Sequence, residues 1–452
     1  MAEREMWATR IGFILAAIGS AVGLGNIWRF PFQASANGGA AFLTVYLAAV
    51  LVIGIPAILA EFVIGRRAKT SAIGAFSKLG RPRWWFVGAI GVVAAGWTLS
   101  YYSVIGGWVI RYIVGATTGA ALADPGTYFG TVSVGIESVV VHALFMLLTV
   151  GIVAFGIEDG IELATKFMVP SIVVLLLGLA VYAFTLEGAG AGYDFLFTAD
   201  FGAIVDNAGT VIPAAVGQAL FSLSLGYSVM ITYASYLGKD DSLLSDGLTV
   251  AVANTGVGIL AGLVVLPLLA IQSGGEISAE GGPGAVFVAI PTALAELPGG
   301  SVVGQAVGFV FFAVVLVAAL SSAISLLETV VAYLVDNYGF ARLPTAVGLG
   351  AGIFLLGVPS AWDTAWLTWF DNISVALFLP LAVLFVVLFV GWVLGADAVA
   401  ELREGSNSPG IATVWLWALR TVVLVAVIGV VALNLYDLFL VPDEGTYFVP
   451  PL

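Results

Sequence analysis

Eleven stretches of the chain are apolar and long enough to cross a membrane, and polar linkers separate them. They are residues 11–30, 41–64, 86–110, 138–155, 167–186, 211–236, 247–271, 302–335, 344–360, 372–395 and 411–440. A membrane-spanning helix needs about 20 mainly apolar residues, so the pattern predicts an all-α polytopic membrane protein. A shorter apolar piece, Ala285–Leu297, is interrupted by Pro291, and we expect it to form a helical cap over one mouth of the bundle.

The lysines and arginines fall almost entirely on one side of the predicted bundle. Twelve of the 15 lie on the side of the N-terminus, Arg111 lies alone on the other side, and Arg29 and Arg420 fall within spans. Cytoplasmic loops carry the excess of these residues. We therefore expect a multi-pass protein of the cell membrane with a cytoplasmic N-terminus, and eleven spans place the C-terminus outside the cell.

The first and sixth spans are poor helices. The first contains three glycines within seven residues, Gly19, Gly23 and Gly25, and each costs about 1 kcal/mol of helix propensity relative to alanine. The sixth holds three serines between Ser222 and Ser228, whose hydroxyls compete for nearby backbone groups. The equivalent positions of the two breaks indicate a 5+5 inverted repeat with a binding site at the bilayer midplane. Gly19 and Gly23 also form a GxxxG, which by itself is typical of close helix packing.

Unwound helices in a membrane expose backbone groups that cannot stay unpaired in lipid. Freed carbonyl groups suit a hard cation such as sodium, and freed N–H groups at a helix N-terminus suit a carboxylate. We therefore expect a site for a zwitterion and sodium that needs no charged side chain.

Composition narrows the classes of function. Hydrophobic residues make up 61% of the chain and charged residues 10%, whereas soluble domains carry about 25% charged residues. The absence of cysteine excludes disulfides and thiolate chemistry, and the single histidine, His142, leaves no histidine-based metal centre. A net charge of −13 leaves no basic face for a nucleic acid. Because the sequence offers no nucleophile–base pair and no metal-ligand set, an enzyme is not expected.

Several motifs together are more specific than any one of them. They are Trp7-Ala8-Thr9-Arg10, Gly19 through Pro31 with Asn26 and Arg29, Asn37-Gly38-Gly39, Gly217-Gln218, Ser222 through Gly226, and Thr232-Tyr233-Ala234-Ser235-Tyr236. With these motifs the chain resembles the neurotransmitter:sodium symporter family, from its beginning to about residue 440. Because it ends after eleven spans, it is similar to the shorter prokaryotic members that move hydrophobic amino acids.

The resemblance implies a LeuT-like fold. Residues 1–186 would form the first inverted repeat, 187–395 the second, and 396–452 an eleventh helix with an extracellular tail. The implied function is sodium-coupled symport of amino acids by alternating access, in which the first and sixth helices rock against the remaining scaffold. A transporter-like amino-acid sensor or a channel with the same fold is the alternative. The exact substrate and the oligomeric state stay open.

The resemblance also implies two sodium sites. For the first, the matching oxygens belong to Ala21, Asn26, Ser222 and Asn254. For the second, they are the carbonyls of Gly19, Val22 and Ala318 and the hydroxyls of Ser321 and Ser322. Ser222 stands where a threonine is common in the family, and it keeps the hydroxyl. The alternative for Ser321 and Ser322 is a simple contact between helices through small residues.

The implied substrate site lies between the two broken helices. The substrate carboxylate would meet the N–H groups of Leu24 and Gly25 and the hydroxyl of Tyr102, and its amine would meet carbonyls around Ala21, Phe221 and Ser224. The side-chain pocket would be lined by Thr98, Tyr102, Phe221, Tyr227, Ser322, Ser325 and Leu326. Monoamine members carry an aspartate at the position of Gly23, so the glycine favours a substrate that brings its own carboxylate.

Two gates are implied as well. Arg29 and Asp371 would form the outer ion pair, with Gln218 beside Arg29 and the rings of Phe221 and Tyr102 as a lid. Arg4 and Asp336 would form the inner ion pair, with Trp7, Ser235 and Tyr236 packed around it. Charged residues inside a membrane are costly and usually functional.

A chloride ion is the last expectation. Family members place the residues that match Tyr46, Gln218, Ser222 and Asn254 around an anion next to the first sodium. The position one turn after Asn254 is usually serine in chloride-dependent members and glutamate in many chloride-independent ones, but this chain has Gly258. We therefore expect chloride to stimulate transport. The alternative is that Gly258 only permits close helix packing and the substrate carboxylate balances the charge.

Overall fold

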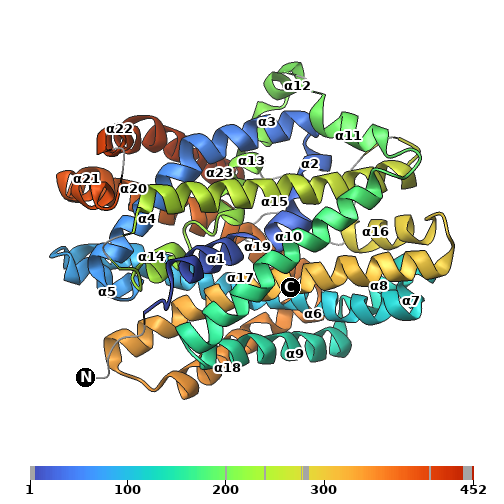
Figure 1. Ribbon diagram of the computed structural model, residues 1–452, viewed down its shortest axis with the longest axis horizontal. Helices are drawn as coiled ribbons and strands as arrows, with labels where there is room; N and C mark the ends of the chain where they lie inside the picture. The colour runs from blue at the N-terminus through green and yellow to red at the C-terminus, as the bar shows by residue number, and fades with distance from the viewer. Residues whose placement is uncertain are drawn as a thin grey trace.

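The computed structural model describes residues 6–198, 201–238, 241–275, 277, 285–406, 409–440 and 450–451. Within these residues the chain is helical and contains no strand. The long helices run roughly side by side as a bundle (Figure 1). Two inner spans, the first and the sixth in chain order, are interrupted halfway, and they position the site described below.

Nine helical segments of the described chain are long and apolar enough to cross a membrane. They are α3 to α4 (Ala40–Ala68), η3 to α6 (Pro82–Thr118), α9 (Gly135–Ala154), η4 to α10 (Ile157–Ala183), α15 (Leu243–Gln272), α17 (Ser301–Tyr338), α18 (Arg342–Trp362), α19 to η7 (Thr364–Leu394), and α22 to α23 (Gly410–Tyr436). Each coincides with one of the apolar stretches predicted from the sequence. The two remaining predicted spans are the broken ones.

The first span consists of α1 (Arg10–Ala21), the π-helical turn η1 (Gly25–Arg29) and α2 (Phe30–Ala36). The two halves meet at an angle of 43°. The sixth consists of α13 (Ala208–Ser222) and the short α14 (Val229–Ala234). Between them Ser224, Gly226 and Ser228 have φ angles of 53°, 81° and 58°, a left-handed conformation that no helix continues. The predicted breaks in both spans are confirmed.

Shorter helices lie at the two ends of the bundle (Figure 1). One end carries Trp7, α5 (Ala72–Lys78), α14 and α21 (Ala396–Arg403), and we call it the Trp7 end. The opposite end, which we call the α8 end, carries a group of small helices. These are α7 (Ala120–Ala123), α8 (Pro125–Val132), α11 (Gly190–Phe197) and α16 (Ala285–Ala295). The short α12 (Phe201–Asp206) protrudes from the side of the bundle next to α3 (Figure 1). The short helix predicted around Pro291 is confirmed as α16.

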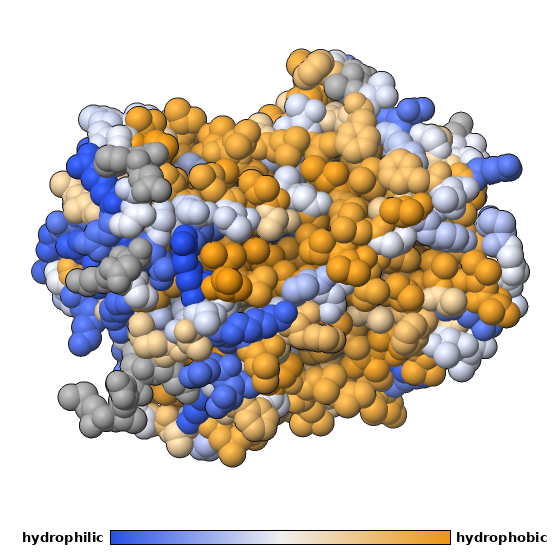
Figure 2. All heavy atoms as spheres, in the orientation of Figure 1, coloured by the Kyte–Doolittle hydropathy of each residue, from blue (hydrophilic) through white to orange (hydrophobic). Residues whose placement is uncertain are grey.

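The outer surface matches a protein that sits in lipid. Figure 2 shows apolar side chains across the middle of one face, with hydrophilic residues gathered at the Trp7 end and fewer at the other. Large apolar side chains such as Phe155, Phe167 and Val205 are more than 70% exposed. Such exposure is stable only against an apolar surrounding. The division of the chain at residues 186 and 395 stays a prediction.

Candidate functional site

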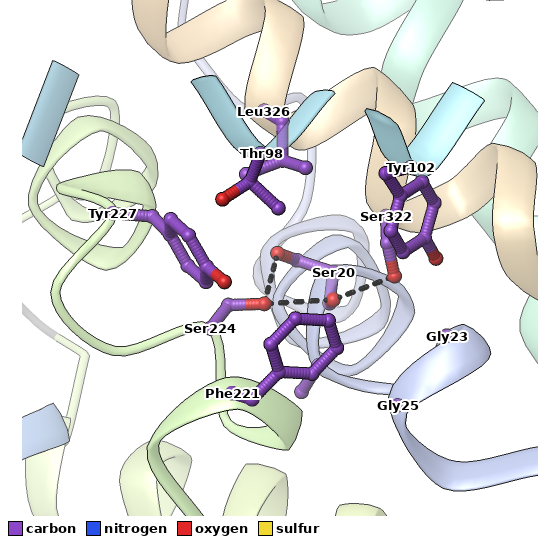
Figure 3. Close-up of a pocket in the computed structure, with 11 residues that line it drawn as sticks. Ser20, Gly23, Gly25, Thr98, Tyr102, Phe221, Ser224, Tyr227, Ser322 and Leu326 are labelled. Atoms are coloured by element: carbon purple, nitrogen blue, oxygen red, sulfur yellow. Dashed lines mark hydrogen bonds between the residues drawn. The ribbon is translucent and has the colours of Figure 1, made fainter. Parts of the chain in front are cut away.

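The two breaks face each other across a cavity in the middle of the bundle (Figure 3). The space within it that a water-sized sphere can reach is only about 20 Å³, enough for a single water, so the surrounding side chains must move apart to admit a larger ligand. Its lining residues come from the first and sixth spans and from α6 and α17. They are Ser20, Ala21, Gly23, Gly25, Thr98, Tyr102, Phe221, Ser224, Tyr227, Ser322 and Leu326. Most of the residues predicted for the substrate site are therefore gathered around one cavity.

A network of serines closes one side of the cavity around Ser20. The Ser20 hydroxyl donates to Ser224 Oγ over 3.1 Å and pairs with Ser325 Oγ at 2.7 Å. The Ser20 carbonyl accepts from Ser224 Oγ at 2.8 Å and from Ser322 Oγ at 2.9 Å. This network joins the first and sixth spans, next to their breaks, to the unbroken α17 (Figure 3). Ser325, predicted to line the pocket, instead bonds to Ser20 from behind the cavity lining.

The corner of the cavity beside Ser322 offers donors to an anion. The N–H of Leu24 donates to the Tyr102 hydroxyl over 3.1 Å, and η1 begins at Gly25 with the positive end of its helix dipole toward the cavity. Gly23 borders the same corner. A Cβ at Gly23 would lie 2.1 Å from Ser322 Oγ and 2.7 Å from the Tyr102 hydroxyl, so only glycine leaves this corner open.

Apolar and aromatic groups form the rest of the wall. The rings of Phe221 and Tyr227 meet edge to face with their centres 6.3 Å apart, and Leu326 comes from α17. The hydroxyl of Thr98 is hydrogen-bonded to Ser374 Oγ at 2.6 Å. The cavity thus combines a polar corner at the helix breaks with a wall suited to an apolar side chain.

The four residues predicted for the first sodium site converge on Asn254. Its side chain can be oriented in two ways. In one, Oδ1 accepts from Asn26 Nδ2 at 2.8 Å and also lies 3.0 Å from the Ala21 carbonyl oxygen and 2.9 Å from that of Ser222. In the other, the amide nitrogen donates to both carbonyls. The first orientation brings three oxygens together, and a cation is what would stabilise it.

These donors suit a monovalent hard cation. Asn26, Ser222 and Asn254 are all buried to 1% exposure or less, and all three are neutral. Asn26 turns its Nδ2 to Asn254, while its Oδ1 accepts from the Gly23 N–H at 3.3 Å, so the predicted Asn26 oxygen ligand would need the amide to rotate. In the parts of the chain that the structure describes, no group of three or more His, Cys, Asp or Glu side chains could hold a metal ion. A divalent or transition metal would normally have such ligands, whereas neutral oxygens fit sodium.

The residues predicted for the second sodium site are also brought together in part. The Ser321 hydroxyl lies 2.9 Å from the Ala318 carbonyl and 3.3 Å from the Val22 carbonyl. A Cβ at Gly19 would lie 3.5 Å from the Cβ of Ser321, so Gly19 flanks the same group. The Ser322 hydroxyl instead faces Ser20 across the cavity. Its assignment to this sodium stays a prediction that requires another side-chain rotamer.

The polar cluster predicted to hold chloride lies directly beside Asn254. The hydroxyls of Tyr46 and Ser222 are 3.3 Å apart, and Asn254 Nδ2 donates to both over 3.4 and 3.2 Å. Gln218 is engaged elsewhere, since its Nε2 donates to the Gly25 carbonyl over 2.6 Å. A Cβ at Gly258 would lie 3.6 Å from both Asn26 Nδ2 and Phe30 Cδ2. That is an ordinary van der Waals distance, so helix packing alone does not require glycine here.

The predicted outer gate lies on the α8 side of the cavity. Arg29 Nη2 is 3.9 Å from Asp371 Oδ2, and both side chains are less than one-fifth exposed. Arg29 Nη1 donates to Gln218 Oε1 over 3.1 Å, and its guanidinium carbon lies 5.2 Å from the centre of the Phe221 ring. The structure therefore places the predicted pair, its glutamine neighbour and the aromatic lid together above the cavity.

The Trp7 end is closed by aromatic packing. Trp7 Nε1 donates to the Tyr233 carbonyl over 2.9 Å, and the indole meets the rings of Phe13, Tyr233 and Tyr236. Ser235 donates to the Thr232 carbonyl at 2.5 Å within the sixth span. Arg4 lies outside the described residues, so its predicted pairing with Asp336 stays a prediction. The cavity therefore lies between the Arg29–Asp371 pair and the packed Trp7 end.

Comparison with known proteins then identifies the fold and its class. A family model for the sodium:neurotransmitter symporter family matches residues 4–123 and 130–448. The chain belongs to this family. The uncharacterized sodium-dependent transporter YhdH of Bacillus subtilis is 36% identical, over 96% of this chain and 99% of its own. The sodium- and chloride-dependent betaine transporter of Caenorhabditis elegans is 27% identical, over 91% of this chain and 78% of its own.

A solved structure matches as well. The crystal structure of MhsT in complex with L-phenylalanine superimposes with a TM-score of 0.87 at 40% identity, covering 96% of this chain and 100% of that one. The protein is thus a sodium-dependent transporter with a LeuT-like fold, and a membrane protein rather than an enzyme. The family resemblance predicted from the motifs is confirmed.

Two acidic residues inside predicted spans of the transporter escaped the sequence analysis. Glu61 of α4 accepts from the Gly226 N–H at 2.9 Å and so supports the unwound part of the sixth span. Glu328 of α17 accepts from the Tyr236 hydroxyl at 2.9 Å and pairs with Arg342. A carboxylate within an apolar span is itself a signal of function. This signal would have identified both Glu61 and Glu328 from the sequence.

Other contacts at the ends had no signal in the sequence. Tyr101 donates to Asp371 Oδ1 over 2.9 Å and so fixes the acid of the outer pair. Glu162 accepts from the Ala8 N–H and the Thr9 hydroxyl, each at 2.8 Å. It thereby clamps the beginning of α1 to the beginning of α10, and a Cβ at Gly12 would collide with its carboxyl group at 2.1 Å.

Proposed function

We propose that this transporter is a sodium-coupled symporter of hydrophobic amino acids that works by alternating access. The observation that carries the proposal is the cavity at the two helix breaks, with a polar corner at Gly23, Leu24 and Tyr102 and an aromatic wall at Phe221 and Tyr227. An amino acid with an apolar side chain complements both. The similarity to MhsT, whose structure contains L-phenylalanine, supports the same class of substrate.

The polar corner explains the proposed coupling. A substrate carboxylate next to Gly23 would face the Leu24 N–H and the Tyr102 hydroxyl, close to the oxygens of Ala21 and Asn26. The substrate then supplies a full negative charge beside the first sodium, so each increases the affinity for the other. We infer the same neutral-oxygen chemistry for a second sodium among Val22, Ala318 and Ser321.

The position of the cavity between the Arg29–Asp371 pair and the packed Trp7 end supports a mechanism with two gates. The outer gate holds a loose ion pair at 3.9 Å between Arg29 and Asp371, and the inner one holds the packed Trp7 indole. Opening them in turn exposes the cavity to one side at a time. We propose that the Trp7 end is cytoplasmic, because most of the lysines and arginines lie at that end.

Uptake by purified protein tests the symport directly. In proteoliposomes, labelled L-phenylalanine should accumulate when a sodium gradient is directed inward and should only equilibrate without one. A tenfold sodium gradient supports up to about 100-fold accumulation if two ions accompany each substrate. Competition by a panel of unlabelled amino acids should favour those with large apolar side chains.

The control replaces sodium by choline on both sides of the same vesicles. Accumulation that is equal with and without the gradient would contradict symport. Binding of L-phenylalanine without any flux would favour the sensor instead, and flux that runs only downhill without saturation would favour the channel.

We also propose that chloride occupies the cluster of Tyr46, Ser222 and Asn254 and stimulates transport. Replacing chloride by gluconate at constant sodium should slow uptake, because an anion about 6 Å from sodium is worth on the order of 3 kcal/mol at an effective dielectric constant near 20. The Gly258→Glu variant should transport equally well in both salts, since its carboxylate would take over the compensating charge.

Gly258→Gln is the matched control, because it adds nearly the same volume without the charge and should stay sensitive to chloride. Uptake by the wild-type protein that does not depend on chloride would contradict the chloride proposal. In that case the substrate carboxylate alone balances the first sodium.

A further inference from the structure

Arg420 lies within a membrane-spanning segment, and no described acidic side chain pairs with it. It belongs to the π-helical turn η8 (Leu419–Val423) between α22 (Pro409–Ala418) and α23 (Leu424–Leu440). Its Nε donates to the Gly391 carbonyl over 2.6 Å. Six other arginines have a carboxylate oxygen within 4 Å, namely Arg10, Arg29, Arg66, Arg67, Arg111 and Arg342. Arg420 has none among the described residues, and its Nη groups meet no hydrogen-bond acceptor there.

Two exposed indole rings hold the Arg420 guanidinium on the outside of the bundle. Its central carbon lies 5.5 Å from the ring centre of Trp392 and 5.4 Å from that of Trp417. These tryptophans are 60% and 58% exposed. Cation–π contacts of this kind fix the plane of a guanidinium, and tryptophans on a membrane protein's surface gather where the lipid headgroups lie.

The position along the bundle agrees with the headgroup level. Gly391 and Trp392 belong to η7 (Phe389–Leu394), with which the tenth span ends. A Cβ at Gly395 would lie 3.3 Å from Arg420 Nη2, so the guanidinium reaches the point at which the chain leaves the apolar layer. The next helix, α21, lies at the Trp7 end (Figure 1).

We propose that Arg420 binds the phosphate group of an anionic phospholipid. A planar guanidinium donates two parallel hydrogen bonds to a phosphate. The Trp392 and Trp417 rings hold the guanidinium in place. Because no described carboxylate pairs with this positive charge, a lipid with a net negative charge binds better than a zwitterionic one.

Native mass spectrometry of the detergent-solubilised transporter tests the proposal. Phosphatidylglycerol should be retained more strongly than phosphatidylcholine with the same acyl chains. In Arg420→Gln the retention of phosphatidylglycerol should fall about tenfold, because a charge-assisted hydrogen-bond pair is lost. Arg81→Gln is the matched control: Arg81 is an exposed arginine at the Trp7 end whose Nη1 donates only to the Gly80 carbonyl, and the variant should retain the lipid like the wild type.

Trp417→Leu keeps the charge and alters only an exposed side chain, so it remains informative if Arg420→Gln does not fold. Its retention of phosphatidylglycerol should fall about twofold to fivefold, as expected for one exposed cation–π contact. The proposal is overturned if both variants retain the lipid like the wild type, or if phosphatidylcholine is retained equally. A second measurement compares the melting temperature of the transporter with phosphatidylglycerol and with inorganic phosphate. The proposal is also overturned if inorganic phosphate raises this melting temperature as much as phosphatidylglycerol does, since the site then binds a free anion.

Discussion

Replacing Asn254 by leucine should abolish sodium-dependent substrate binding. The Asn254 side chain is the point at which the Ala21 and Ser222 carbonyls and the Asn26 amide meet, all within 3.0 Å. Leucine has a similar size but no oxygen, so a dehydrated cation would lose one ligand and the two carbonyls would lose their partner. The apparent sodium affinity, measured as the sodium dependence of L-phenylalanine binding, should fall at least about 100-fold.

Two further variants separate this effect from general damage to the helix. Thr249→Val changes an exposed residue of the same helix, whose hydroxyl bonds only to the Ser245 carbonyl, and should leave the sodium dependence unchanged. Ser222→Thr keeps the hydroxyl and should be tolerated. Asn26→Leu should behave like Asn254→Leu. Sodium affinity at the wild-type level in either leucine variant would show that the first sodium lies elsewhere.

Local signals in the sequence were sufficient to predict the framework around this site. The length of the apolar runs determines the spans, because lipid permits only helices with all backbone groups paired. The glycines from Gly19 to Gly25 and the serines from Ser222 to Ser228 destabilise helix geometry at the positions where α1 and α13 end. Residues from other parts of the cavity wall, such as Tyr102 and Phe221, were assigned to the site through the family resemblance.

Contacts between segments depend on the rotation of each side chain, and the sequence does not encode that locally. Ser20 shows this best: a serine in a helix usually bonds within its own helix, but here its hydroxyl and carbonyl reach Ser224, Ser322 and Ser325. Its central position follows from the bend after Ala21, which turns the end of α1 toward the eighth span. The same network draws the Ser322 hydroxyl away from its predicted sodium.

Contacts between residues far apart in the sequence were the second feature that the sequence did not predict. Glu162 and Ala8 are joined by a hydrogen bond across 154 positions, and only the packing of α10 on α1 brings them together. In contrast, Glu61 and Glu328 were visible as acids inside apolar spans. Their partners, the Gly226 N–H and the Tyr236 hydroxyl, required the three-dimensional path of the unwound sixth span.

Introducing an aspartate at Gly23 should reverse the choice of substrate. The Cβ at this position points at Ser322 Oγ and the Tyr102 hydroxyl, 2.1 and 2.7 Å away, so the new carboxylate would occupy the corner proposed for the substrate's own. Two carboxylates about 4 Å apart repel by about 4 kcal/mol at an effective dielectric constant of 20, which corresponds to roughly a thousandfold loss of affinity for L-phenylalanine. Phenylethylamine, which lacks the carboxylate, should bind the variant better than it binds the wild type.

Gly23→Ala separates the volume of the added group from its charge. Its methyl group displaces the Ser322 hydroxyl, whose side chain can rotate, so the affinity for L-phenylalanine should fall far less and phenylethylamine should gain nothing. Sodium-induced thermal stabilisation should persist in Gly23→Asp, because the introduced carboxylate lies beside the oxygens of Ala21 and Asn26 and compensates the cation as the substrate does. If Gly23→Asp still bound L-phenylalanine with wild-type affinity, the substrate carboxylate would have to lie away from Leu24 and Tyr102. The coupling between substrate and the first sodium would then need a different physical basis.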